Sequence, residues 1–162
     1  QCHPHVHIGY LYNHSLNYNI LLPDLRYTGL TEGDAIQMGW LDRKDVLQWI
    51  DTAPALFGDS LKAVVHGISM GAATTMMVSG EKTPEYITCF VEDCGYTSVW
   101  DQFSKELKGL FGLPPSVALY GQLDLPAPER MELQEASALS QVARCTKPML
   151  FIHGDNDDFV PT

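Results

Sequence analysis

Hydrophobic residues along this chain occur in two kinds of pattern, and the two kinds alternate. Short continuous apolar runs are typical of strands buried on both faces of a sheet, and they occupy residues 19–22, 61–68, 86–92 and 148–153. Apolar side chains at the spacing of one helix face are typical of covering helices, and they occupy residues 38–53, 70–79, 98–111 and 133–142. The alternation predicts an α/β fold, a mostly parallel sheet with helices on both faces.

Capping and helix-breaking residues predict where the helices begin and end. Pro54 and Gly58 are predicted to end the first helix, while Ser98 is predicted to cap the third, which ends at Gly112. The charged residues of the first helix are expected to form a solvated face; they are Asp42, Arg43 and Asp45.

Two stretches fit neither pattern. Residues 1–18 hold four of the six histidines and are predicted to be irregular. Residues 113–132 are rich in proline and are predicted to be a lid-like insertion. Because there is no internal repeat or low-complexity tract, the whole chain, 1–162, is predicted to be one domain.

Composition excludes several classes of function. The chain has 162 residues, 45% of them hydrophobic, with 10 Lys and Arg against 20 Asp and Glu, a net charge of −10. The basic residues are scattered, which disfavours binding to nucleic acid or to an anionic membrane surface. No apolar run reaches the roughly 18 residues that span a bilayer.

The chain begins with Gln1, so a processed start or a fragment is expected. The compartment (cytoplasm or bacterial cell surface) and the oligomeric state stay open.

The sequence offers little that would hold a metal or cofactor. The cysteines lack C-x-x-C or zinc-ribbon spacing and are expected to be buried free thiols; they are Cys2, Cys89, Cys94 and Cys145. His3, His5 and His7 would share one face of an extended segment and could bind zinc or nickel. Pro4 interrupts that segment, and no carboxylate lies nearby to orient such ligands. We therefore expect incidental metal affinity there, and no functional metal site or cofactor.

Residues 67–71 read G-I-S-M-G between a predicted strand and a predicted helix. This G-x-S-x-G spacing is typical of a nucleophile elbow, in which Ser69 sits on a strained turn and presents its hydroxyl above the sheet. A side chain at Gly67 or Gly71 is expected to collide with the neighbouring helix and strand. The Met70 N–H, at a helix N-terminus, would face an oxyanion formed by attack of Ser69. The alternative is a glycine-rich strand-to-helix turn that contains a serine without a catalytic role.

A second motif, H-G-D-N-D-D-F-V-P, begins at His153 directly after a predicted strand. With it the chain resembles the α/β-hydrolase superfamily, and in particular bacterial serine hydrolases of the esterase-like and prolyl-oligopeptidase-like (peptidase S9-like) branch. Residues 19–26 and 92–103 share that resemblance, which covers roughly 19–113 and 133–162. It implies a partial α/β-hydrolase fold in which Asp157 orients the catalytic histidine. The order of Ser69 before Asp157 agrees with that superfamily.

The chain departs from that superfamily at both ends. A catalytic histidine is expected to follow Asp157, yet no histidine lies among the last five residues. His66 and His153 each precede a motif and are expected to pack or cap. The N-terminal strand that ends in H-G and supplies the second oxyanion N–H is also missing, and residues 26–29 read R-Y-T-G in place of an R-G-H-G-like turn. These departures predict a truncated, partly frame-shifted or degenerate member.

The leading functional hypothesis is therefore a serine hydrolase that cleaves a small-molecule carboxylic ester, and secondly an amide or peptide, through an acyl-enzyme on Ser69. Residues 113–132, in the position of a lid, would determine the substrate. The alternative from another class is a catalytically inactive α/β-hydrolase-like fragment or binding module. A metal-binding protein that uses the histidine-rich start is a third hypothesis.

Overall fold

The computed structural model describes residues 4–33, 36–112, 114, 116 and 135–160. Its helices and strands follow in the order α1 (Pro4–Leu16), α2 (Asp42–Phe57), β1 (Ala63–Ile68), α3 (Met70–Ser79), β2 (Ile87–Asp93), α4 (Val99–Phe111), α6 (Ala138–Val142) and β3 (Met149–Ile152). No helix in these described ranges is long and apolar enough to span a membrane. The predicted lid-like insertion, 113–132, lies outside the described residues except at 114 and 116.

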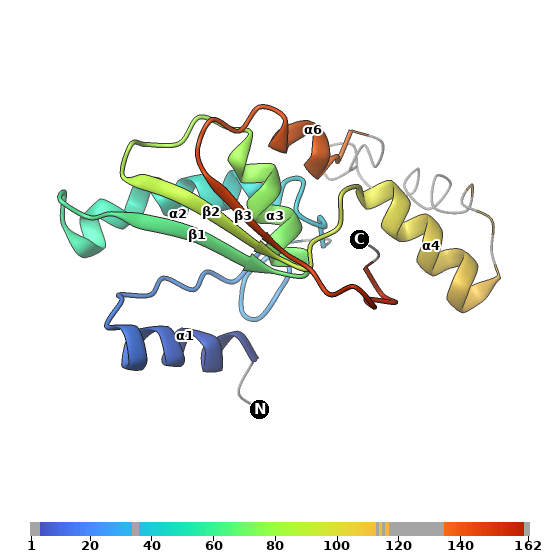
Figure 1. The fold of residues 1–162 in the computed structure, drawn as a ribbon, viewed down its shortest axis with the longest axis horizontal. Helices are drawn as coiled ribbons and strands as arrows, with labels where there is room; N and C mark the ends of the chain where they lie inside the picture. Colours follow the sequence, from blue (N-terminus) through green and yellow to red (C-terminus); the bar gives the residue numbers. More distant parts are fainter. Residues whose placement is uncertain (1–3, 34–35, 113, 115, 117–134, 161–162) are drawn as a thin grey trace.

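The three strands form one parallel sheet in the order β1-β2-β3. Helices α2, α3 and α6 lie on one side of this sheet and α1 lies on the other, while α4 lies beyond the carboxyl ends of the strands (Figure 1). This arrangement confirms the predicted α/β fold. The face toward α1 is only partly covered, because Leu150 and Ile152 of β3 are 56% and 43% exposed.

Helix α3 is the centre of the core. Each residue from Ala72 to Ser79 is buried, and the helix contacts β1, β2, α2 and α6. Small side chains at Ala72 and Ala73 allow the helix to lie close to the sheet, while Met77 and Phe90 fill the space on either side with less than 2% of their surface exposed. The closely packed helix therefore holds the turn that precedes it in a fixed position.

The prediction of a strand over 19–22 is wrong. The prediction that residues 1–18 are irregular is also wrong, because α1 lies within them. Residues 19–22 are extended but pair with no strand in the described structure, where β1 pairs only with β2. A strand needs a partner for its backbone hydrogen bonds, and among the described residues no such bond joins 19–22 to a strand. Ile20 and Leu22 instead pack against Gly9 of α1, the helix that the sequence pattern did not predict. Pro4 stands at the first position of α1, where its missing N–H costs nothing.

Helix α2 continues past Pro54, where it was predicted to end. A proline cannot donate to the carbonyl four residues earlier, which here belongs to Ile50. The hydroxyl of Tyr86 donates to that carbonyl instead. The helix therefore runs to Phe57 and ends at Gly58, whose φ is 90° and whose N–H donates to the Pro54 carbonyl at 2.8 Å.

The predicted solvated face of α2 is also wrong, because its charged residues are turned inward. Asp42 is 1% and Arg43 is 9% exposed. Buried charges need partners, and each has one: Asp42 accepts from the Gly39 N–H at 2.7 Å, Arg43 pairs with Glu81 at 2.9 Å, and Asp45 pairs with Arg26 at 2.6 Å. Burial raises the pKa of the Asp42 carboxyl above its ordinary value.

The remaining helix boundaries follow from serine caps. Ser98 accepts from the Asp101 N–H at 3.3 Å and begins α4, as predicted, and Gly112 ends it with a left-handed φ of 64°. Helix α6 begins later than predicted because Ser137 caps it, accepting from the Ser140 N–H at 3.2 Å. Ser137 also forms a β-bridge with Ser98, which ties the starts of the two helices together.

Candidate active site

Ser69 lies on a sharp turn between β1 and α3. Its backbone angles are φ 56° and ψ −119°, a combination that costs a non-glycine residue about 1–3 kcal/mol. Hydrogen bonds on both sides offset this cost: the Ser69 N–H donates to the Asp93 carbonyl at 2.8 Å, and the Ser69 carbonyl accepts from Ala72 and Ala73 at 2.9 and 3.0 Å. The turn therefore has the geometry that the G-x-S-x-G motif predicts for a nucleophile elbow.

The two motif glycines differ in how strongly the turn requires them. A Cβ at Gly67 would lie 1.9 Å from the Gly71 carbonyl oxygen, so no other residue fits, as predicted. The expected collision at Gly71 is wrong, because a Cβ there would have no atom within 4 Å. The helix backbone passes over Gly67, whereas Gly71 is itself part of that backbone. A further close approach occurs at Gly95, where a Cβ would lie 2.8 Å from the Ala72 Cβ.

Met70 is the first residue of α3. The N–H groups in the first turn of a helix have no carbonyl of that helix to bond, and the helix dipole adds partial positive charge there. A carbonyl oxygen that becomes negative on attack by Ser69 would be stabilised by such a donor. The oxyanion role of the Met70 N–H stays a prediction.

Asp157 lies on the loop that follows β3, and its carboxylate is held by that loop. Oδ1 accepts from the N–H groups of Phe159 and Val160 at 3.0 and 2.8 Å. The Val160 N–H is the main reason that the pKa of the Asp157 carboxyl is lowered. The Phe159 N–H, His153 and Lys105 act in the same direction, against the effect of burial. Asp157 is therefore ionised near neutral pH, the state in which a carboxylate orients a histidine.

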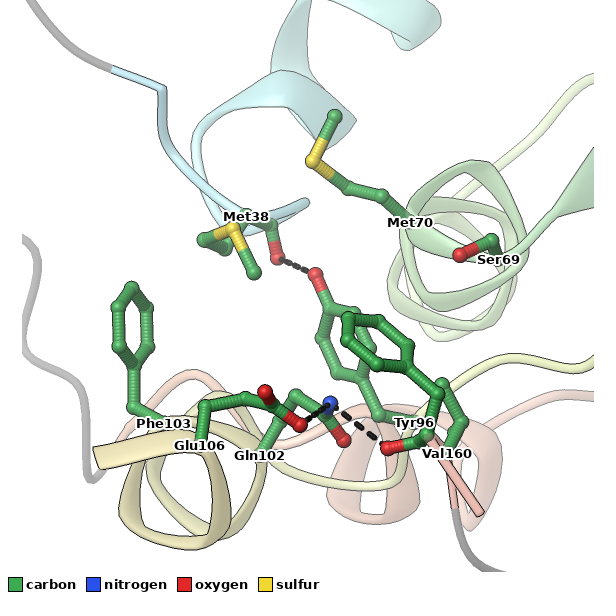
Figure 2. A pocket seen from close by; sticks show the side chains of 9 residues that line it. Met38, Ser69, Met70, Tyr96, Gln102, Phe103, Glu106 and Val160 are labelled. Carbon is green, nitrogen blue, oxygen red and sulfur yellow. Dashed lines mark hydrogen bonds between the residues drawn. The ribbon is translucent and has the colours of Figure 1, made fainter. Parts of the chain in front are cut away.

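A pocket of about 150 Å³ lies beside the elbow (Figure 2). It is lined by Met38, Ser69, Met70, Tyr96, Gln102, Phe103, Glu106, Phe159 and Val160. Ser69 and Met70 thus line the same pocket, as the elbow geometry requires. Asp157 is not among the lining residues, but the loop that carries it contributes Phe159 and Val160 to the wall.

Similarity to known proteins decides the family. The model of the prolyl oligopeptidase family, Peptidase_S9, matches residues 33–162. The chain belongs to the prolyl oligopeptidase family. The uncharacterized protein YqkD of Bacillus subtilis strain 168 is 25% identical to it over 147 residues, which cover 90% of this chain and 48% of that protein.

Solved structures similar to this prolyl oligopeptidase-family chain have the α/β-hydrolase fold. Two crystal forms of the Pyrococcus furiosus esterase Pf2001 align with TM-scores of 0.62 and 0.61, at 22% and 20% identity, covering 86% of this chain and 50% and 51% of the esterase. The Pyrococcus horikoshii acylaminoacyl peptidase aligns with a TM-score of 0.53 at 18% identity, covering 76% of this chain and 19% of the peptidase. The chain spans about half the length of the first relatives that it matches.

Cys94 lies where the ends of the three strands meet. Its φ is 54°, and its N–H donates to the Ile152 carbonyl at 2.8 Å. Burial raises the pKa of the Cys94 thiol, the Ser69 backbone opposes that rise, and the negative charges of Asp93, Asp157 and Glu92 add to it. Both site residues therefore act on Cys94, which the sequence treated only as a buried thiol. The cysteines in the described residues are free but half-buried; they are Cys89, Cys94 and Cys145.

Neither histidine near the two motifs lines the pocket. The Nε2 atom of His153 lies 2.7 Å from the Val160 carbonyl oxygen and 3.7 Å from Asp157 Oδ2, which ties the loop to the end of β3. The Nδ1 atom of His66 lies 3.2 Å from the Tyr12 hydroxyl of α1. Both contacts agree with the packing and capping roles expected for these residues.

No group of three or more His, Cys, Asp or Glu side chains in the described residues is arranged to hold a metal ion. The candidate N-terminal ligands, His3 and the side chains of His5 and His7, lie outside the described residues, as does Cys2.

The contribution of α4 to the pocket was not predicted from the sequence. Gln102, Phe103 and Glu106 of that helix line it, and the buried Tyr96 anchors the opposite side by donating to the Met38 carbonyl at 2.8 Å. Burial raises the pKa of the Tyr96 phenol, which is therefore neutral. The helical spacing of α4 indicated an apolar face but not which neighbour that face would contact.

Proposed function

We propose that the full-length protein is a serine hydrolase that cleaves carboxylic esters through an acyl-enzyme on Ser69. The observation that carries the proposal is the strained backbone of Ser69, at φ 56° and ψ −119°, at the wall of a largely apolar pocket. Membership of the prolyl oligopeptidase family supports it, since this is a family of serine hydrolases of the α/β-hydrolase type. Amides and peptides are the second substrate class.

In the proposed reaction, the Ser69 hydroxyl oxygen attacks the ester carbonyl carbon while its proton passes to a histidine base. That base would come from residues outside these 162, and Asp157 would orient it. The Met70 N–H would donate to the carbonyl oxygen as it gains negative charge. The alcohol leaves with the proton from the histidine, and a water molecule then hydrolyses the acyl-enzyme to a carboxylic acid.

The pocket beside Ser69 favours a compact, uncharged acyl group. An apolar cavity of about 150 Å³ accommodates a molecule the size of benzene, and this pocket has about that volume. Met38, Met70 and Phe103 offer apolar, adaptable contacts to such a group. The carboxylate of Glu106 in the wall would repel an anionic acyl group.

Hydrolysis of a series of p-nitrophenyl esters by the full-length protein tests the proposal. We expect turnover of the butanoyl and hexanoyl esters to exceed that of a long-chain ester, and Ser69→Ala to reduce kcat at least about a thousandfold. Ser60→Ala, at an exposed serine, is the matched control and should leave kcat unchanged. Undiminished hydrolysis by Ser69→Ala would exclude Ser69 as the nucleophile.

A catalytically inactive binding module is the second candidate. It is favoured by the pocket-lining residues that the structure describes, which include no histidine. For the same reason, the 162-residue chain alone should hydrolyse p-nitrophenyl acetate poorly. If the full-length protein also fails with every ester and amide tested, this second candidate replaces the first.

A further inference from the structure

The peptide group between Phe159 and Val160 is held at both of its ends. Its N–H donates to Asp157 Oδ1 at 2.8 Å. Its carbonyl oxygen accepts from Gln102 Nε2 at 3.0 Å and from Lys105 Nζ at 2.9 Å. A single peptide group therefore connects two side chains of α4 to the carboxylate proposed to orient the catalytic base.

We infer that Gln102, assisted by Lys105, is the positioning residue that holds Asp157 in its working orientation through the Phe159–Val160 peptide group. The catalytic meaning of this inference rests on the proposed function, whereas the contact itself does not. Gln102 would not touch the substrate's reacting atoms or the base; it acts through the peptide group.

The burial and position of Gln102 suit this role. Its side chain is 7% exposed, so an unused amide N–H there would carry the cost of burial without a partner. Besides the Phe159 carbonyl, the same nitrogen donates more weakly to Glu106 Oε1 at 3.4 Å. Lys105 lies three residues further along α4, on the same side of the helix, and also donates to the Asp158 carbonyl. The loop is therefore joined to α4 by several hydrogen bonds rather than by one.

Hydrogen bonds to a peptide carbonyl polarise the group and make its N–H a stronger donor. Two donors on the Phe159 carbonyl, one of them cationic, should therefore strengthen the hydrogen bond from the Val160 N–H to Asp157. This agrees with the direction in which the pKa of Asp157 is shifted, for which that N–H is the largest cause. The other ionisable groups that act on Asp157 or are acted on by it are His153, Lys105 and Cys94.

The same helix also lines the proposed acyl pocket. Figure 2 shows Gln102 between Glu106 and Val160. Its side-chain nitrogen is hydrogen-bonded to both the Glu106 carboxylate and the Phe159 carbonyl, on the loop that carries Asp157. A group that enters the pocket against α4 would therefore contact the element that sets the orientation of Asp157.

The first test compares two buried glutamines by NMR in the full-length protein. Gln102→Met keeps the side-chain length and removes the donor, while Gln141→Met does the same on α6, where the amide oxygen accepts from Arg144. We expect Gln102→Met to move the Val160 amide proton upfield and to raise the pKa of Asp157 toward its ordinary value. Gln141→Met should change neither. Unchanged Val160 and Asp157 signals in folded Gln102→Met overturn the inference.

Lys105→Met keeps the inference testable if Gln102→Met does not fold, because the Lys105 contact is exposed. The same changes at Val160 and Asp157 are expected, and the part that arises from the Lys105 charge should shrink at about 1 M salt. No change in either signal overturns the inference.

In the full-length protein, Gln102→Met should lower kcat for the best ester about tenfold, because a misplaced acid weakens stabilisation of the transition state. Unchanged kcat would show that α4 does not position the acid. If wild-type protein and Ser69→Ala are equally inactive, the proposed function fails, while the NMR comparison still decides whether Gln102 holds Asp157.

Discussion

At the scale of single residues, the backbone around Ser69 explains why the motif needs one of its glycines more than the other. Gly67 faces the carbonyl of Gly71 at a distance that excludes any Cβ, and this requirement could be predicted from the strand-to-helix spacing alone. The motif gives no information about Gly71, because the space around it depends on what packs against α3. Similarly, the sequence indicated Asp157 by resemblance, but the two N–H groups that hold its carboxylate are visible only in the folded loop.

Alanine substitutions at the two motif glycines should have opposite effects on stability. Gly67→Ala forces the backbone of β1 and α3 apart and should lower the free energy of unfolding by about 3 kcal/mol or more. Gly71→Ala adds a good helix former in open space and should raise it by up to about 1 kcal/mol. Urea unfolding of both variants measures the difference, and equal destabilisation would contradict the geometry of the elbow.

Stability should depend on pH through Asp157. Since the pKa of its carboxyl is lower in the folded state than the ordinary value of 3.8, ionised Asp157 stabilises the fold above that value. The contribution is lost as the pH falls through the folded-state pKa. Asp157→Asn should therefore lower the free energy of unfolding near neutral pH, and the gap from wild type should narrow only below about pH 4. Denaturant unfolding at several pH values checks this, and a gap that widens on acidification would contradict it.

At the scale of helices and strands, the local apolar pattern predicts an element well where packing and hydrogen bonding with neighbouring elements favour the same structure. The strands β1, β2 and β3 and the helices α3 and α4 lie where the apolar patterns indicated. The run over 19–22 failed because a strand also needs a partner, which no local pattern supplies. The extension of α2 past Pro54 depends on a hydroxyl 32 positions away, from Tyr86, and so could not be predicted from the helix's own residues.

A double-mutant cycle between Pro54 and Tyr86 tests that explanation. Tyr86→Phe leaves the Ile50 carbonyl without the hydroxyl and should cost about 1 kcal/mol. In the background of Pro54→Ala the alanine N–H can donate to the same carbonyl, so the cost of Tyr86→Phe should fall to nearly zero. Thermal or urea unfolding of the four proteins gives the coupling energy. Strictly additive effects would contradict the explanation that the Tyr86 hydroxyl replaces the N–H that Pro54 lacks.

At the scale of the whole molecule, β1 and β2 are well covered on the α3 face of the sheet, whereas the α1 face and the edge strand β3 are more exposed. The α3 face carries the buried core, whereas Val64, Leu150 and Ile152 on the α1 face are 51%, 56% and 43% exposed. An exposed apolar area of this kind favours association or the binding of apolar molecules. The sequence predicted the parallel sheet. It could not show which face would be open, because that depends on where α1 lies.

The isolated 162-residue chain should therefore bind a hydrophobic dye or self-associate. Replacing Leu150 and Ile152 by threonine keeps strand-forming residues while reducing the exposed apolar surface, so dye fluorescence and the apparent mass in light scattering should both fall. Leu139→Thr, at a 65% exposed leucine of α6 away from the strands, is the control and should have little effect. A monodisperse wild-type chain that binds no dye would contradict this account of the open face.

Labelling of the full-length protein with a fluorophosphonate probe tests the central claim most directly. Such a probe reacts covalently with a serine whose hydroxyl is activated by a base, and mass spectrometry of the digested protein locates the modified residue. The strained elbow and its pocket predict a single modification at Ser69 that is lost in Ser69→Ala and retained in Ser60→Ala. A folded full-length protein that stays unlabelled, or that is labelled at another serine, would contradict the assignment of Ser69 as the nucleophile.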